Sequence, residues 1–288
     1  MPNLIHDSLN SERATAEWGQ SPWQAELHLR FGTRAEYPGT ALLERRHRGP
    51  LVVQRPFHPE GDPCHVYVVH PPGGVVGGDE LAIDVQVDAG AHALLTTPAA
   101  TKFYRCDARR ATQTQRLVAR DATLEWLPQE NIFYRGADVR VTTRVQLEGD
   151  TRFIGWEIAC LGLPARGEHF DSGRLELDLE LWRDEPVFID RLRLAGDSAA
   201  RHARWGLAGQ EAIGTLLATP ASAAHVDAVR ALLVDKPLAA VSLVDGVLVV
   251  RALAPQAAPV RELFAAAWRV LRPAILGRPA HAPRIWST

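Results

Sequence analysis

Lysine and cysteine are both scarce in this sequence. Only Lys102 and Lys236 are lysine among 32 basic residues, and 34 acidic residues leave a formal net charge of −2. Without a basic surplus, the chain lacks the electrostatic attraction that binds nucleic acid. The three cysteines, Cys64, Cys106 and Cys160, lie far apart, so neither a disulfide framework nor a zinc or redox motif is expected. We therefore predict no nucleic-acid partner.

Long apolar runs are absent as well. A run such as residues 238–250 is broken by Asp245 and Gly246, well short of the ~20 residues that span a bilayer. The first residues have no basic start followed by an apolar stretch, as a secretory signal would. We therefore predict a cytoplasmic protein without membrane contact. Residues 1–20 are polar and unpatterned and predict a mobile extension, whereas residues 21–288 contain no dividing linker and predict a single domain.

What the sequence does have is alternation. Apolar and polar side chains alternate over residues 23–31, 81–87, 139–147 and 175–181, and this period of two is typical of half-buried strands. The regular exchange of strand and helix that marks a parallel α/β protein is missing. Together these patterns predict a mainly β fold, with strands dominating up to about residue 220.

Two helices are expected, both in the C-terminal half. Ser222 can cap a helix that ends before Pro237. A second helix runs from about Pro259 to Pro273, because its apolar residues recur at helical spacing. Between the two helices, Asp245-Gly246 separates two apolar segments and predicts a hairpin with a two-residue turn.

The most distinctive segment is His70–Asp79, which contains Gly73, Gly74, Gly77 and Gly78. A phosphate-binding loop needs Lys and Ser or Thr after its last glycine and then a helix, whereas here Asp79 and a strand follow. The dinucleotide fingerprint fails for the same reason. The segment therefore predicts a tight connection between strands, where glycine permits backbone angles that side chains forbid.

Further short motifs follow in a fixed order. They are Leu94–Arg105 (LLTTPAATKFYR), Leu127–Glu130 (LPQE), Ala165–Glu168 (ARGE), Gly277–Ala280 (GRPA) and Arg284–Trp286 (RIW). With the glycine-rich segment, this order resembles the urease accessory protein family UreD, called UreH in some organisms. The resemblance runs from about Trp23 to the C-terminus.

The resemblance implies a β-helical stack of strands with few helices. It also implies a scaffold that is not an enzyme: family members bind apo-urease and UreF, and UreF in turn holds the GTPase UreG. The assembly loads nickel in a GTP-dependent way, with UreE as the indirect source of the metal. The family is thought to give Ni²⁺ an internal route, so we expect transient Ni²⁺ and no permanently bound cofactor.

Acids within the motifs are the candidate residues of that route. Weakly held carboxylates suit a passing ion better than a cage of thiolates and imidazoles. Glu130, Glu168 and Asp79 match the family motifs; alternatively each caps a turn or pairs with an arginine such as Arg166. The motif residues expected to shape the fold or meet a partner are Gly73, Gly74, Gly77, Gly78, Lys102, Tyr104, Gln129, Arg166 and Gly167. Lys102 and Tyr104 either contact a partner or finish a strand.

Histidines gather near a cysteine. His58, His65 and His70 flank Cys64, but the five-residue step from His65 to His70 sends their side chains to opposite faces of a strand. We interpret them as surface or turn histidines. We also interpret Asp190 and its neighbour Arg191 as a structural pair.

Two positions depart from the family pattern. Arg135 stands where an acid is common, and Leu163 stands where an arginine is usual. A relay that used an acid at position 135 therefore cannot operate here.

Two other functions remain open. In a hydrolase, two of Glu130, Asp138 and Glu168 would act as acid and base, although no nucleophile elbow or metalloprotease motif supports it. A plain interaction module without a metal path would tolerate loss of Glu130 and Glu168.

Overall fold

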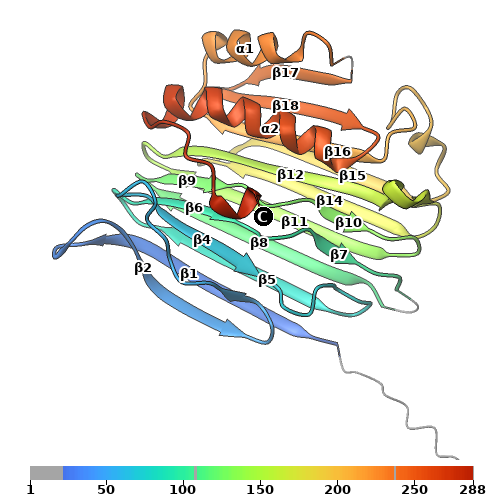
Figure 1. The fold of residues 1–288 in the computed structure, drawn as a ribbon, viewed down its shortest axis with the longest axis horizontal. Helices are drawn as coiled ribbons and strands as arrows, with labels where there is room; N and C mark the ends of the chain where they lie inside the picture. The colour runs from blue at the N-terminus through green and yellow to red at the C-terminus, as the bar shows by residue number, and fades with distance from the viewer. Residues whose placement is uncertain (1–21, 107–108, 237, 288) are drawn as a thin grey trace, which may run out of the picture.

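The structure, a computed structural model, describes residues 22–106, 109–236 and 238–287. The predicted extension over residues 1–20 lies outside these ranges. Strands dominate the described chain and the two long helices come late, so the mainly β prediction is confirmed (Figure 1).

One sheet has seven strands. Its strands bury one side chain in two, as β1 does with Ala25, Leu27, Leu29 and Phe31. That alternation directs the apolar residues toward a second sheet and the charged residues toward solvent. In spatial order the strands are β15 (Pro186–Ala195), β14 (Arg174–Trp182), β11 (Asp138–Glu148), β8 (Ala111–Arg120), β5 (Glu80–Val87), β1 (Gln24–Arg34) and β2 (Tyr37–Arg48).

The second sheet has eleven strands within the described ranges. Both of its faces are covered near the middle, so strands such as β12 are buried almost throughout. Its main order is β17 (Ala239–Val244), β18 (Val247–Ala254), β16 (Ala212–Thr219), β12 (Arg152–Leu163), β9 (Thr123–Trp126), β6 (His92–Thr96), β4 (Cys64–Val69) and β3 (Val52–Val53), with β10 (Asn131–Phe133), β7 (Thr101–Phe103) and β13 (Glu168–His169) beside it.

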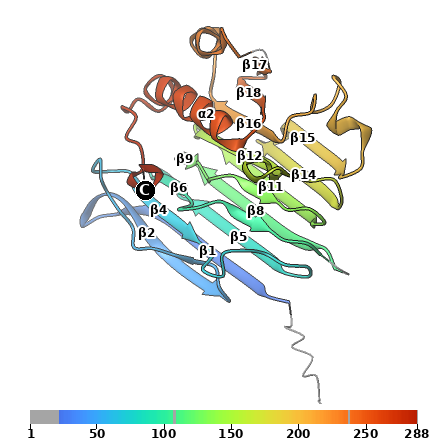
Figure 2. The ribbon, with the colours of Figure 1, turned by 45° about the vertical axis from the view of Figure 1, so that its right-hand side comes forward.

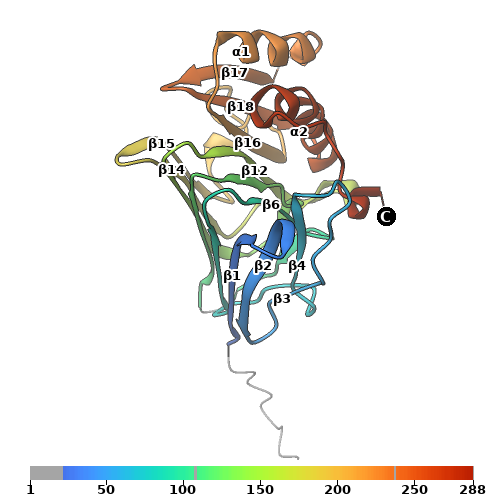
Figure 3. The ribbon, with the colours of Figure 1, turned by 90° about the vertical axis from the view of Figure 1, so that its left-hand side faces the viewer.

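The chain alternates between the two sheets as a coil. From β4 it passes to β5, back to β6, on to β8 and β9, then to β11, β12 and β14. Successive turns pair in parallel, with β5, β8, β11 and β14 on one side and β4, β6, β9 and β12 on the other. Parallel pairing here needs no helix, because a strand of the opposite sheet makes each crossover. Figure 3 shows the two sheets facing each other. The β-helical arrangement implied by the resemblance is therefore present.

A short third row of strands forms one corner of the coil. Val75 bridges to Phe103 at the end of β7, β7 pairs with β10, and β10 pairs with β12, all in parallel. The segment His70–Asp79 makes the connection from β4 to β5 at this corner, as predicted. A Cβ on Gly74 would overlap the ring of Tyr104, so glycine lets the chain pass close to that ring.

The helices cover the outer face of the eleven-stranded sheet (Figure 2). α1 (Ala223–Arg230) is capped by Ser222 and continues as η3 (Ala231–Leu233), and α2 (Ala257–Leu271) ends before Pro273, as predicted. The Asp245-Gly246 hairpin joins β17 to β18 with φ angles of 45° and 76°. The remaining short helices are η1 (Pro164–Arg166), η2 (Ala199–Arg201), the π-helical turn η4 (Arg272–Leu276) and η5 (Arg284–Ser287). No helix of the described ranges is long and apolar enough to cross a membrane.

Candidate functional site: a polar cavity inside the coil

A cavity of about 240 Å³ lies between the two sheets beside the corner row. Polar side chains enter it because the inward positions of β8, otherwise apolar, include Gln113 and Gln115. The motif segments supply much of the rest of its wall. Its polar lining residues are His70, Thr97, Thr101, Lys102, Gln113, Gln115, Gln129, Asn131 and Glu157.

A second hollow continues from the first. It has about 40 Å³ and shares Asn131, Glu157 and Ile158 with the larger cavity. It then reaches Asp190 on β15 and Thr215 on β16. The two hollows therefore follow one another from the motif corner to the space between β15 and β16, with Glu157 where they meet.

Glu157 is held by a chain of polar groups. The Thr143 hydroxyl lies in hydrogen-bond contact with the Glu157 carboxyl and 3.0 Å from Gln115 Oε1. A hydroxyl has one proton, so both contacts are satisfied when Glu157 donates to Thr143 and Thr143 donates to Gln115. Burial raises the pKa of Glu157 to about 7, against the lowering effect of the Thr143 hydrogen bond. Glu157 lines both hollows.

Asp190 lines the second hollow at its end near the surface. Its carboxylate accepts from Arg251 at 2.9 Å and from the Thr215 hydroxyl at 3.3 Å. Arg251 comes from β18 and also lies over the Phe188 ring, 5.9 Å from its centroid. Because the Arg251 side chain is 54% exposed, this ion pair lies at the surface of the protein.

A charged network is buried elsewhere, under the end of α2. Arg272 has no exposed surface and pairs with Glu60 at 2.7 Å and with Glu125 at 3.0 Å. His65 meets Glu60 and His92 meets Glu125, both at 2.7 Å. Despite burial, the hydrogen bonds to His65 and Arg272 lower the pKa of Glu60 to about 2. This network ties α2 to the coil and is separate from the cavity.

Asp79, a predicted route residue, is buried in its turn. Its carboxylate accepts the backbone N–H of Trp23 at 2.8 Å and that of Val76 at 2.9 Å. Both bonds hold the glycine-rich connection against the start of β1. Asp79 does not line either hollow within the described residues.

Glu130 and Glu168 lie apart. Glu130 pairs with Arg261 of α2 at 2.9 Å, whereas Glu168 is exposed on β13. Asn131, next to Glu130, pairs with Ala159, but Glu168 pairs with Leu163. Four residues of strand separate those positions by roughly 13 Å.

The hydrolase alternative needs carboxyl groups about 5–9.5 Å apart on one cleft. The separation of Glu130 and Glu168 along β12 does not bring that pair together. Asp138, the third candidate, pairs with Arg110 at 2.7 Å on the outer face of the seven-stranded sheet. No two of the three face one hollow within the described residues.

The other motif residues surround the corner. Lys102 and Gln129 line the cavity, and Arg261 donates to the side-chain Oε1 of Gln129 at 3.2 Å. Tyr104 is 40% exposed and its ring is stacked on Tyr134, 5.0 Å between centroids. Arg166 and Gly167 are exposed at the end of η1, where Gly167 adopts a φ of 70°.

The histidines near Cys64 do not form a metal site. His65 is buried against Glu60, which corrects the surface or turn interpretation for this residue. His58 contacts the Thr40 carbonyl at 2.8 Å, and His70 lines the cavity. Burial raises the pKa of the Cys64 thiol to about 12. Across the described ranges, no cluster of three or more His, Cys, Asp or Glu is placed to hold a metal ion.

Three residues have partners or places that the sequence did not predict. Asp190 does not pair with Arg191, because neighbours on a strand point to opposite faces; Arg191 instead lies 3.7 Å from Asp178. Arg135, a departure from the family pattern, pairs with Asp171 at 2.7 Å. Leu163, the other departure, precedes η1 and pairs with Glu168 in the strand register.

Glu157 is not among the residues that the sequence predicted for the site, although the sequence contains a signal for it. It is the only acid within β12, a strand whose other residues are mostly apolar and buried. Glu125 is likewise a lone acid in β9, and it is fully buried with partners. A single carboxylate inside an apolar strand is costly unless it is neutral or paired, so such positions indicate special roles.

The sequence matches a known protein family over nearly its whole length. The family model described as UreD urease accessory protein matches residues 24–287. A urease accessory protein UreD of Alkalilimnicola ehrlichii is 46% identical over 271 residues, covering 92% of both chains. That of Pseudomonas putida strain W619 is 45% identical over 285 residues, covering 97% of this chain and 100% of its own. A UreD 2 of Brucella anthropi is 43% identical over 272 residues, covering 92% and 98%. This chain therefore belongs to the UreD family of urease accessory proteins.

Proposed function

We propose that this protein assists the incorporation of nickel into urease and that the two joined hollows are the internal route of the ion. The observation that carries this proposal is the run of polar groups from the motif corner through Glu157 to Asp190. An apolar core between two sheets would have no reason to place Gln113, Gln115 and Glu157 around one cavity. Ni²⁺ is cargo here, not a resident cofactor.

The lining suits a passing divalent ion. Amide and carboxyl oxygens with water bind such an ion weakly, so it can leave again. Because burial raises the Glu157 pKa to about 7, this carboxyl is only partly ionised at neutral pH when no ion is present. An ion that reaches Glu157 displaces its proton and is held by the resulting carboxylate. The empty route therefore carries less buried charge at Glu157 than a fully ionised carboxylate would bring.

The partners follow from the same role. The relatives are named urease accessory proteins, and we propose that this chain binds apo-urease and UreF in the cytoplasm. Through UreF it would meet the GTPase UreG, and the metallochaperone UreE would supply nickel indirectly. Loading would depend on GTP hydrolysis by UreG, and this chain would catalyse no reaction itself.

The test is co-expression of urease with its accessory proteins, with and without this gene. Omission is expected to abolish nickel incorporation and urea hydrolysis. Replacement of Glu157 by Gln, which keeps the shape but cannot ionise, is expected to lower the nickel content of urease several-fold while the complex still assembles. The matched control is Glu148→Ala, which removes an exposed acid paired with Arg120 on the outer face.

Two outcomes contradict the proposal at different levels. Normal nickel content without the gene rejects the accessory role. Normal nickel content in Glu157→Gln, with complete failure on omission, rejects the route and leaves a plain interaction module.

A further inference from the structure

One buried hydrogen-bond donor in the wall of the 240 Å³ cavity has no partner in the part of the chain that the structure describes. It is the indole N–H of Trp126, a side chain that lines the cavity and is 2% exposed. An indole nitrogen can only donate, and a buried donor without an acceptor costs about 1–3 kcal/mol. A hydrogen-bond acceptor inside the cavity would remove this cost.

Two glutamines of β8 add further donors to the same wall. Gln113 and Gln115 point between the sheets and are 5% and 3% exposed. The Gln115 Oε1 accepts the Thr143 hydroxyl, so the NH₂ group is what this amide has left to offer. Among the described residues, neither that NH₂ group nor the Gln113 amide has a hydrogen-bond partner. The occupant that these groups fit is therefore rich in acceptors.

The charges around the cavity favour a negative occupant. Lys102 is a lining residue and forms no ion pair within the described ranges. Glu157 is the only acid of the lining, and it is only partly ionised at neutral pH because burial raises its pKa to about 7. Burial lowers the pKa of His70, so its ring adds no full charge at neutral pH. One cation is thus left without a matching carboxylate.

The same groups limit the kind of anion. A charge-assisted hydrogen bond to an oxyanion is stronger than one to a neutral acceptor, and the two or three oxygens of a small planar oxyanion can meet several donors at once. A second negative charge would be buried without a second cation, which is unfavourable. Formate and nitrate have the expected shape and charge, whereas phosphate is too highly charged.

We propose that the 240 Å³ cavity binds a small oxyanion of single negative charge. The Trp126 N–H and the amides of Gln113 and Gln115 donate hydrogen bonds to it. Lys102 balances its charge. Only the role of the anion beside Ni²⁺ rests on the proposed function: there it would offset part of the positive charge that the ion and Lys102 bring together, since like charges repel strongly in a buried site.

The experiment follows the indole N–H signals of the ¹⁵N-labelled full-length protein by nuclear magnetic resonance. The chain has eight tryptophans, and the signal that disappears in Trp126→Phe belongs to Trp126. Titration with sodium formate or sodium nitrate is expected to shift this signal along a saturating curve. Sodium chloride at the same ionic strength should cause no saturating shift, and sodium phosphate should bind at least tenfold more weakly than formate.

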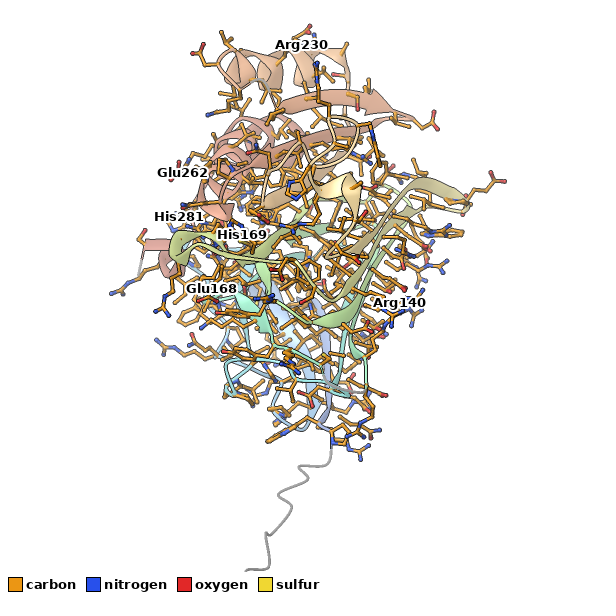
Figure 4. The ribbon with its side chains drawn as sticks, turned by 90° about the vertical axis from the view of Figure 1, so that its right-hand side faces the viewer. Arg140, Glu168, His169, Arg230, Glu262 and His281 are labelled. Atoms are coloured by element: carbon orange, nitrogen blue, oxygen red, sulfur yellow. The ribbon has the colours of Figure 1, made fainter. Side chains whose placement is uncertain are left out.

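Two variants test the groups that hold the anion. Gln113→Leu is expected to weaken formate binding about tenfold, as loss of a hydrogen bond to a charged group does. Its control is Gln86→Leu, the same change on the solvent face of β5. Lys102→Met should also weaken binding severalfold. Its control is Arg230→Met, which removes a positive charge from α1 at the surface, away from the cavity (Figure 4).

A Trp126 signal that does not move, or moves with formate as it does with chloride, would show that water occupies the cavity and would overturn the anion site. Equal formate affinity in Lys102→Met and Arg230→Met would also overturn it, as would phosphate binding as tight as that of formate. Each of these results leaves the nickel route to be judged separately, by omission of the gene and by Glu157→Gln.

Discussion

The ionisation of Glu157 is set by its surroundings. A carboxyl between two sheets loses the hydration that favours its charged form, so burial raises the pKa to about 7. By contrast, Glu60 is also partly buried but has Arg272 and His65 as hydrogen-bond donors, and its pKa falls to about 2. Two acids in one protein thus differ in their degree of ionisation at neutral pH, because only Glu60 has an arginine partner.

Glu157→Gln should change how stability depends on pH. The folded-state pKa of about 7 lies above the usual 4.5, so between these values the unfolded chain releases a proton that the folded chain keeps. The free energy of unfolding of the wild-type protein therefore falls as pH rises from about 4.5 to 7. The variant lacks this loss. Its free energy of unfolding relative to that of wild type should therefore be higher at pH 8 than at pH 4.5, by roughly 1–3 kcal/mol. Urea unfolding of both proteins at the two pH values measures this difference. The prediction would be contradicted if the stabilities of variant and wild type changed with pH in parallel.

Arg272→Met should destabilise the fold strongly. The change leaves Glu60 and Glu125 buried without their shared cation, and breaking a buried pair typically costs about 3–5 kcal/mol. Arg278→Met is the control, because its ion pair with Asp62 is more than a third exposed and should contribute only about 0–1 kcal/mol. Urea unfolding compares the two. Equally small losses of unfolding free energy in the two variants would show that the Arg272 network contributes little to stability.

Local periodicity predicted the elements but not their neighbours. The strands β1, β5, β11 and β14 follow from alternation, and α1, α2 and the Asp245-Gly246 hairpin follow from caps and turn residues. Alternation says which side chains face inward, but not which strand lies alongside, so the parallel coil came only from the resemblance. Residue partners were harder still: Glu60 and Arg272 are 212 residues apart, and no local pattern links them.

Packing between elements predicts the effect of a larger residue on β16. A Cβ on Gly214 would lie 2.6 Å from both Phe264 and Val260 of α2. Gly214→Ala should therefore push the helix from the sheet and cost about 1–3 kcal/mol. Adding Val260→Ala removes part of the obstruction and should recover some of the loss. Thermal unfolding of the single and double variants measures this, and a stable single variant would show that α2 adjusts freely.

At the scale of the whole molecule, the coil has a closed corner and an end. The corner row of β7, β10 and β12 closes the motif side. At the end of the stack of strands, β15 of one sheet and β18 of the other are joined by the ion pair of Asp190 and Arg251. A route between the sheets can therefore leave near β15 without unpairing any strand of the coil.

A larger side chain at the narrow end of the route tests whether the ion passes between the two sheets. Leu192 lines the 40 Å³ hollow, a space little larger than one water molecule, so Leu192→Trp should block it. Ile189 lies three residues away on β15 and is 43% exposed, so Ile189→Trp adds the same bulk to the opposite face. Co-purification should show both variants in the assembled complex. The nickel content of urease should fall only with Leu192→Trp. A folded Leu192→Trp variant that loads nickel normally would place the path of the ion outside the coil.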